Sequence, residues 1–193
     1  MSSHHIVRDQ QEPALLLTNV EGLQLRHIET LLEWNPTVLV LSSCYEKVAS
    51  WGVKIDVIID SREQSQSNTY DYSPFIKRVE VADVLEGVLN YLTNLNYEAL
   101  TIYGSYERWS KEIEQIKPNI RLVIHSVEGR YFYRDYFKKW VGKNHRFNVR
   151  SSVMLYNVRN LEPYQSGYRS IEEGFIEMRA NQPFWIQLYH EEI

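Results

Sequence analysis

Short apolar runs separated by polar, turn-forming segments fill the first two thirds of the chain. Five continuous apolar or β-branched runs predict buried strands. They span residues 14–17, 37–41, 55–59, 99–103 and 122–124. Apolar residues at helical spacing predict four helices between them. These helices cover residues 25–32, 44–51, 82–95 and 107–116. Because strands alternate with helices to about residue 126, the pattern predicts an α/β fold with a parallel sheet.

The pattern changes after residue 126. Residues 147–150 alternate between apolar and polar side chains, and residues 175–178 and 184–189 do the same on either side of a predicted turn at 180–183. Such a pair of runs is typical of a β-hairpin, with Pro183 at an edge or at the start of a strand. We therefore expect an α/β domain over residues 1–126, a connection over 127–146 and a small β domain over 147–193.

Composition places the chain among ordinary globular proteins. Of its 193 residues 44% are hydrophobic, and 21 Lys and Arg stand against 25 Asp and Glu, which gives a net charge of −4. This balance argues against whole-chain attraction to nucleic acid or to an anionic membrane. Cys44 is the single cysteine, no signal-like apolar segment follows Met1, and no apolar run approaches the ~20 residues of a membrane helix. We expect a cytoplasmic protein.

Positive charge is concentrated in residues 130–150, where seven Lys and Arg accompany one acidic residue. Interleaved basic and aromatic residues occur in proteins that bind single-stranded nucleic acid. The same pattern fits an amphipathic connection whose basic groups reach the solvent while its aromatic rings face the core. Those rings are Tyr131, Tyr133, Phe137 and Trp140. The acidic chain favours the second interpretation, and nucleic acid is not an expected partner.

Small polar residues follow the predicted strands, where open parallel sheets bind ligands. They are Asn19, Ser42, Ser43, Gly104 and Ser105. Backbone N–H groups and hydroxyls at such positions can bind a phosphate, although Ser and Asn also serve as ordinary helix caps. Ser42 and Ser43 in particular can cap the helix that follows them. The sequence has neither of the glycine-rich nucleotide fingerprints, so the residues leave both roles open.

Three carboxylates could hold a magnesium ion, which prefers oxygen ligands in octahedral geometry. Asp60 and Glu63 flank the end of the third predicted strand, and Asp83 opens the strongest predicted helix. Asp83 alone is better explained as a negative charge that favours the helix N-terminus, whereas Asp60 alone leaves both roles open. The six histidines are scattered, so a zinc site is not expected, and Cys44 is expected to be a small buried side chain.

The chain resembles a bacterial subgroup of thiamine pyrophosphokinases. Residues 2–16 resemble the start of those proteins, and residues 137–140 (FKKW) resemble a phrase of their domain connection. The resemblance can be followed over most of the chain and thins after about residue 150. It implies a nucleotide-binding α/β domain followed by a β-sandwich domain, transfer of pyrophosphate from ATP to thiamine with Mg²⁺, and a homodimer.

The residues of the family motifs are mostly changed here. Ser42 and Ser43 replace an Asp-Gly pair, and residues 60–63 (DSRE) stand where the family has Gly-Asp-x-Asp. Without a gap, Ser61 and Glu63 fall on the two acids, whereas a one-residue gap places Asp60 and Arg62 there. In the remaining motifs Asp83 and Arg108 are retained, and Lys111 occupies the last position of the Arg108 motif. The thiamine-contacting Ser-Ser-Asn stretch is shortened to residues 167–170, and the resemblance implies Tyr168 and Ser170 as the residues that would contact substrate.

These replacements lead to three hypotheses. The first is a thiamine-pyrophosphokinase-like protein whose catalytic site is disabled or weakened, because each lost electrostatic partner costs on the order of 10²–10³ in rate. Such a protein would still bind a nucleotide or a thiamine-like molecule. The second is an active enzyme in which Asp60, Glu63 and Asp83 hold Mg²⁺ and Arg108 and Lys111 neutralise ATP. The third is an interaction module that uses residues 130–150.

Overall fold

The computed structural model describes residues 12–21, 25–61, 76–150 and 153–189, and these divide into two compact units. The first unit extends to Arg121 and the second begins at Leu122. Residues 127–146, which we expected to be a connection, lie in the second unit and include its strand β7 (Gly129–Val141). Among the described residues, no helix is long and apolar enough to cross a membrane.

The first unit contains a parallel sheet of five strands in the order β5-β1-β2-β3-β4. The strands are β1 (Ala14–Leu17), β2 (Val38–Leu41), β3 (Val57–Ser61), β4 (Lys77–Val81) and β5 (Ala99–Tyr103). Every residue of β1, β2 and β3 is buried, as expected of strands covered on both faces. The parallel α/β architecture predicted from the alternating pattern is therefore confirmed.

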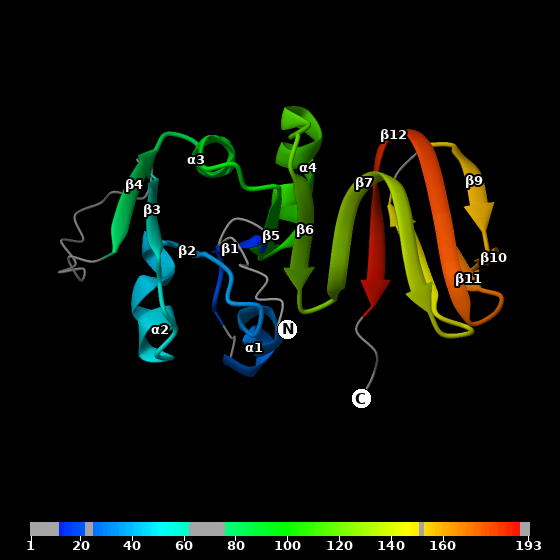
Figure 1. Ribbon diagram of the computed structural model, residues 1–193, viewed down its shortest axis with the longest axis horizontal. Coiled ribbons are helices and arrows are strands. Elements are labelled where there is room, and N and C mark those ends of the chain that lie inside the picture. Colours follow the sequence, from blue (N-terminus) through cyan, green and yellow to red (C-terminus); the bar gives the residue numbers. More distant parts are fainter. Residues whose placement is uncertain (1–11, 22–24, 62–75, 151–152, 190–193) are drawn as a thin grey trace, which may run out of the picture. The chain divides into compact units, whose positions relative to one another are not determined.

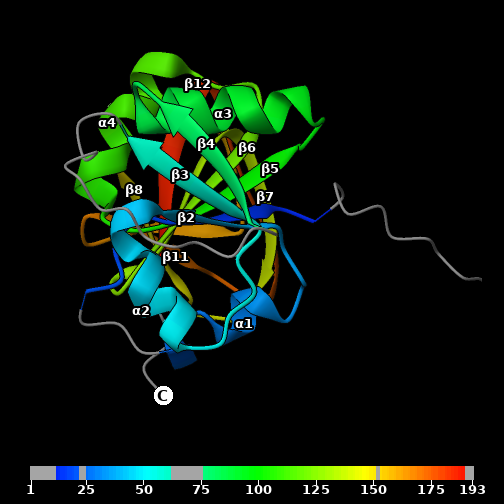
Figure 2. The ribbon, with the colours of Figure 1, turned by 90° about the vertical axis from the view of Figure 1, so that its left-hand side faces the viewer.

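Helices cover both faces of this sheet (Figure 2). Helices α3 (Val84–Asn94) and α4 (Tyr106–Ile116) lie on one face, and α1 (Glu29–Leu32) and α2 (Tyr45–Ser50) lie on the other. Each helix of the first pair buries an apolar stripe, which is the pattern that predicted it. The short 3₁₀ helices Leu25–His27 and Ser42–Cys44 precede α1 and α2. The prediction of one continuous helix over residues 25–32 is wrong in this respect.

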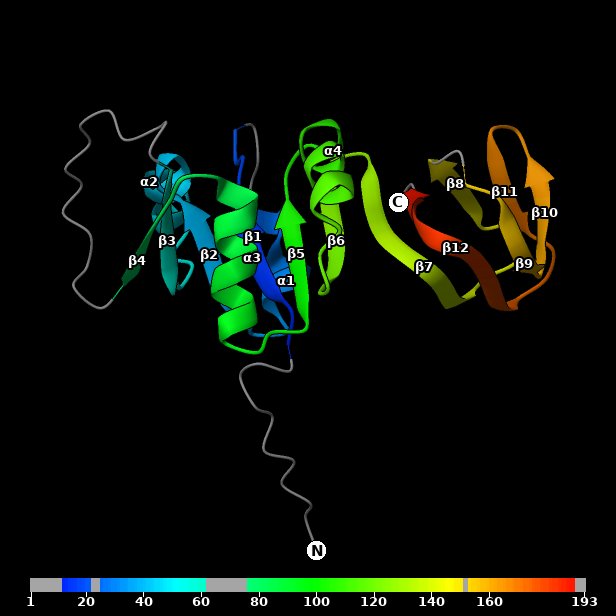
Figure 3. The ribbon, with the colours of Figure 1, turned by 90° about the horizontal axis from the view of Figure 1, so that it is seen from above.

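The second unit is β-rich and antiparallel (Figures 1 and 3). Besides β7 it contains β6 (Arg121–Ser126), β8 (Arg146–Arg150), β9 (Leu155–Arg159), β10 (Leu161–Tyr164), β11 (Gly167–Ser170) and β12 (Gly174–Tyr189). The pairing order is β6-β7-β12-β8-β11-β10, and β9 pairs with β12 as well. Strand β6 is antiparallel to its neighbour β7.

One long strand replaces the predicted hairpin of residues 175–189. Strand β12 continues through the expected turn, and a bulge between Arg179 and Phe184 absorbs the extra residues, Pro183 included. A bulge leaves residues out of the ladder, so it tolerates a residue that has no N–H group. The first half of β12 pairs with β7 and β9, and the second half of β12 pairs with β7 and β8.

The side chains of these strands enclose one hydrophobic core of the second unit. Its buried members include Phe137, Phe147, Ile176, Phe184 and Ile186. Phe137 and Tyr131 are buried, as expected of the aromatic residues in the basic segment, but Trp140 is 55% exposed. The alternation of β7 explains the difference, because successive side chains of a strand point to opposite faces.

Candidate functional site

The parallel sheet of the first unit brings most of the predicted site residues to one edge. Carboxyl ends of parallel strands meet along the same edge, and the loops that follow them form it. The residues placed there are Asn19 after β1, Ser42 and Ser43 after β2, Asp60 at the end of β3, and Gly104 and Ser105 after β5. Asp83 follows β4, and Arg108 lies in the first turn of α4. Glu63 and Arg62 lie outside the described residues.

Asp60 is buried and forms an ion pair with Arg78 of the neighbouring strand β4. The Asp60 side chain is only 8% exposed, whereas that of Arg78 is 51% exposed. A carboxylate in this setting requires a partner, and Arg78 supplies both the positive charge and a hydrogen bond from Nε. The guanidinium therefore occupies the place beside this carboxylate where a cation would otherwise be expected.

Asp83 and Ser105 have the local roles of helix caps. Asp83 Oδ1 accepts a hydrogen bond of 2.9 Å from the backbone N–H of Glu86, at the start of α3. Ser105 Oγ accepts one of 3.4 Å from the N–H of Arg108, at the start of α4. Asn19 Oδ1 similarly accepts a 2.9 Å bond from the N–H of Glu21. The side-chain oxygens of these three residues thus satisfy nearby backbone donors.

Ser42 and Ser43 do not cap the following helix. The N-cap residue of α2 is Cys44, and no side chain accepts a hydrogen bond there. Cys44 is buried as expected, and burial raises the pKa of its thiol, although hydrogen bonds from Ser43 and the backbone of Val20 and the charge of Arg108 act in the opposite direction. A thiol in this environment is a poor nucleophile near neutral pH.

The charge of Arg108 acts on two neighbouring groups at this edge, Cys44 and Glu112. Arg108 is exposed, and its guanidinium lies 4.6 Å from the centroid of the Trp109 ring. The pKa of Glu112 is raised, mainly because the side chain is partly buried and to a lesser extent because Asp83 is negatively charged. The positive charge of Arg108 acts in the opposite direction. Glu112 is a further candidate residue that the sequence analysis did not name, and its spacing of four residues from Arg108 on a helix is the signal that could have pointed to it. Lys111 is exposed on the same helix.

Gly104 allows a close approach of Trp109 to the end of β1. Trp109 Nε1 donates a 3.1 Å hydrogen bond to Thr18 Oγ1, which in turn donates a 2.9 Å bond to the carbonyl of Tyr103. A Cβ atom at Gly104 would lie 2.3 Å from Thr18 Oγ1 and 2.9 Å from Trp109 Nε1. The glycine is therefore required by packing at this strand end.

The described side chains do not fit a divalent cation. No group of three His, Cys, Asp or Glu side chains is placed to hold a metal ion within the described part of the chain. A magnesium site requires several oxygen ligands around one point, and here Asp60 is paired with Arg78 while Asp83 caps α3.

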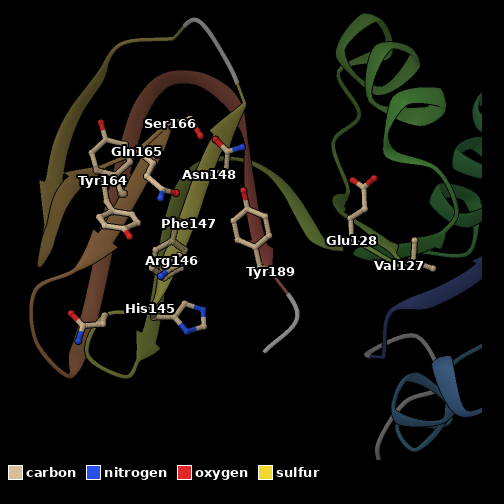
Figure 4. A pocket seen from close by; sticks show the side chains of 13 residues that line it. Val127, Glu128, His145, Arg146, Phe147, Asn148, Tyr164, Gln165, Ser166 and Tyr189 are labelled. Carbon is tan, nitrogen blue, oxygen red and sulfur yellow. The ribbon is translucent and has the colours of Figure 1, made fainter. Parts of the chain in front are cut away.

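A separate pocket of about 720 Å³ lies within the second unit (Figure 4). It is formed by the β6–β7 turn, strand β8 with the residues before it, the β10–β11 turn and the end of β12. Its lining includes Glu128, Arg146, Asn148, Tyr164, Tyr168 and Tyr189. Volume and lining suit a small ligand with an aromatic ring and hydrogen-bonding groups.

Of the two residues expected to contact substrate, only Tyr168 lines this pocket. Ser170 is fully buried, and its hydroxyl donates a 2.7 Å hydrogen bond to the Gly142 carbonyl and accepts a 2.8 Å bond from the N–H of His145. The guanidinium of Arg146 lies 5.2 Å and that of Arg169 4.8 Å from the centroid of the Tyr164 ring.

A buried polar network supports the Glu128 side of the pocket. The Tyr131 hydroxyl donates a 2.8 Å hydrogen bond to Glu128 Oε2 and accepts a 3.0 Å bond from Gln187 Nε2. Arg150 Nε donates a 3.0 Å bond to Gln187 Oε1. Burial, and then the hydrogen bond and charge of Glu128, raise the pKa of Tyr131. The network joins β7, β8, β12 and the β6–β7 turn.

Comparison with solved structures finds the same architecture in thiamine pyrophosphokinases. The chain superposes on the enzyme from Bacillus subtilis with a TM-score of 0.62 and 8% identity over 94% of this chain and 100% of that chain. For the enzyme from Geobacillus thermodenitrificans the TM-score is 0.66 at 5% identity, with 93% and 97% covered. A probable thiamine pyrophosphokinase from Staphylococcus saprophyticus gives 0.60 at 12% identity, with 93% and 100% covered.

Sequence comparison gives a different result, since neither a family model nor a curated protein matches the chain. At identities of 5–12% the structural likeness establishes the fold and leaves the activity open. The parallel first unit and the β-rich second unit agree with the architecture that the sequence resemblance implied. The chain therefore has the thiamine pyrophosphokinase fold.

Proposed function

We propose that this chain is a thiamine-pyrophosphokinase-like protein in which metal-dependent pyrophosphoryl transfer is lost or severely weakened, and which retains binding of a small aromatic ligand. The ion pair between Asp60 and Arg78 carries the proposal. If Asp60 matches a metal-binding acid of the family, its carboxylate is already neutralised by a guanidinium. If Ser61 matches that acid instead, a buried hydroxyl stands in its place.

Loss of rate follows from the electrostatics of the reaction that the resemblance implies. Transfer of a pyrophosphoryl group requires positive charge, usually from a metal, near the oxygens that become more negative in the transition state. Removing one such partner costs on the order of 10²–10³ in rate. The family has an acid at the position of Ser42 and, in the alignment without a gap, at that of Ser61. Arg108 and Lys111 remain available to contact phosphates at the same edge.

A coupled assay of AMP release tests the catalytic part of the proposal. The protein is incubated with ATP, thiamine and Mg²⁺ beside the Bacillus subtilis enzyme as a positive control. We expect a rate at least about 10²-fold below the control, the effect of losing one electrostatic partner. A comparable rate would contradict the proposal and favour the active enzyme in which Asp60, Glu63 and Asp83 hold Mg²⁺. In that case Asp83→Asn should abolish turnover while Glu114→Gln should not.

The ligand-binding part rests on the pocket of the second unit. Thermal shift with ATP, AMP, thiamine and thiamine diphosphate, each with and without Mg²⁺, should reveal a compound that raises Tm, because binding to the native state stabilises it. We expect Tyr168→Ala, in the pocket, to abolish that shift. Tyr156→Ala removes an exposed ring on β9, outside the pocket, and should preserve the shift. No shift with any of the four compounds would count against retained binding.

A further inference from the structure

A second pocket, of about 540 Å³, lies in the first unit at the opposite edge of the parallel sheet. It is formed around the amino ends of β2 and β3, by the first 3₁₀ helix, α1 and the segment between α2 and β3. The predicted site residues lie at the carboxyl ends of the same strands, so this pocket is distinct from them. Its apolar lining consists of Leu25, Leu32, Pro36, Val38, Trp51 and Val53.

The polar lining of this pocket is predominantly negative. Glu29, Glu33 and Asp56 line it, and Lys54 is the cation that accompanies them in the lining. Asp56 is fully engaged, because Oδ1 pairs with Lys54 Nζ at 2.7 Å and Oδ2 accepts a 2.9 Å hydrogen bond from the N–H of Val38. The negative charge left over belongs to Glu29 and Glu33, both of which are exposed.

The position of Glu33 is unfavourable without a cation, whereas Glu29 lies in the first turn of α1, where the helix dipole favours its charge. The two glutamates are four residues apart around α1, where like charges repel each other. Glu33 is also the C-cap residue of α1, where the helix dipole favours positive charge. A cation bound beside both carboxylates would relieve the two effects together. Lys47 lies 5.9 Å from the centroid of the Trp51 ring, and Arg26 stands three residues before Glu29 in the preceding 3₁₀ helix.

We propose that this pocket binds a small amphipathic organic cation, with its apolar part against Leu32, Val38 and Trp51 and its ammonium group beside Glu29 and Glu33. The pocket volume lies within the range of small-molecule sites, and apolar walls with a few convergent charged groups are their usual composition. The apolar walls supply most of the affinity, and the two glutamates supply the preference for positive charge. This site is independent of the function proposed above.

Calorimetric titration with a matched pair of probes tests the proposal. Phenethylammonium carries a ring and an ammonium group, whereas 2-phenylethanol has the same ring and chain without the charge. We expect saturable binding of the cation with a dissociation constant on the order of 1 mM, as is usual for so small a ligand. The neutral probe should bind more weakly. Equal affinity for both probes, or no binding of the cation up to about 10 mM, would overturn the proposal.

Variants locate the binding site. The double substitution Glu29→Gln and Glu33→Gln should weaken binding of phenethylammonium by about 2- to 30-fold, the effect of removing two exposed ion pairs. Glu46→Gln with Glu114→Gln removes two exposed carboxylates outside the pocket and should leave binding unchanged. Circular dichroism of both variants verifies folding. Unchanged binding in the first variant, or binding of a lysine-rich peptide in preference to phenethylammonium, would contradict the proposal.

Discussion

At the scale of single residues, the ion pair between Asp60 and Arg78 makes a prediction about stability. Arg78→Ala leaves a buried carboxylate without its partner, at a cost of about 1–3 kcal/mol in the free energy of unfolding. Arg121→Ala is the matched control, because its pair with Glu98 is exposed on both sides and should cost less than about 1 kcal/mol. Urea unfolding measures both. Equal effects would show that the Asp60 pair has no special structural role.

Gly104 makes a second prediction at this scale. Gly104→Ala forces its Cβ against Thr18 Oγ1 and Trp109 Nε1, so we expect a loss of about 1–3 kcal/mol in the free energy of unfolding. Gly142→Ala is the control, since no atom lies within 4 Å of the added Cβ there. Its effect should remain within about 0.5 kcal/mol. Thermal or urea unfolding of both variants decides whether packing at this strand end requires the glycine.

At the scale of elements, the Tyr131 network predicts how stability depends on pH. In the unfolded chain the hydroxyl of Tyr131 loses its proton near pH 10. Because the pKa of Tyr131 is raised in the native state, the native chain keeps that proton to higher pH. The free energy of unfolding should therefore fall as the pH rises above about 10. Tyr131→Phe should make that fall shallower and cost about 1–3 kcal/mol at neutral pH.

Urea unfolding between pH 8 and 11 would measure this dependence. The matched control is Tyr156→Phe, because Tyr156 is exposed on β9 and this variant should keep the slope of the unaltered chain. An unchanged slope in Tyr131→Phe would mean that other groups determine the dependence on pH.

The elements of the first unit could largely be predicted from the sequence, because buried parallel strands appear as continuous apolar runs. Strand β4 was missed, since as an edge strand it exposes most of its residues and carries charges at Lys77, Arg78 and Glu80. Strand β7 combines aromatic and basic residues, a pattern that also fits a connection, so the sequence did not predict it. The hairpin prediction failed because a bulge accommodates Pro183 within β12.

The position of the candidate site could be predicted, but the roles of its side chains could not. Parallel topology places Asn19, Asp60 and Gly104 at one edge whatever their roles are. The partner of Asp60 is Arg78, whose position depends on the unpredicted strand β4. Asp83 and Ser105 cap helices, an alternative that the sequence had left open.

At the scale of the whole molecule, the family resemblance predicts a homodimer. Light scattering coupled to size-exclusion chromatography should give a mass twice that of the 23.0 kDa chain. Measurement over a range of loading concentrations would distinguish a stable dimer from a weak one, because a weak dimer dissociates on dilution. A mass of 23.0 kDa at every concentration would contradict this prediction.

The position of β12 affects how the second unit is made. Strand β7 ends at Val141 and β8 at Arg150, yet both pair with a strand that begins at Gly174. At about 5–20 residues per second, a ribosome leaves β7 without that neighbour for a few seconds. During that time the unpaired backbone groups and the aromatic side chains of β7 are available to other nascent chains. We therefore expect newly made copies to depend on chaperones more than the finished protein does.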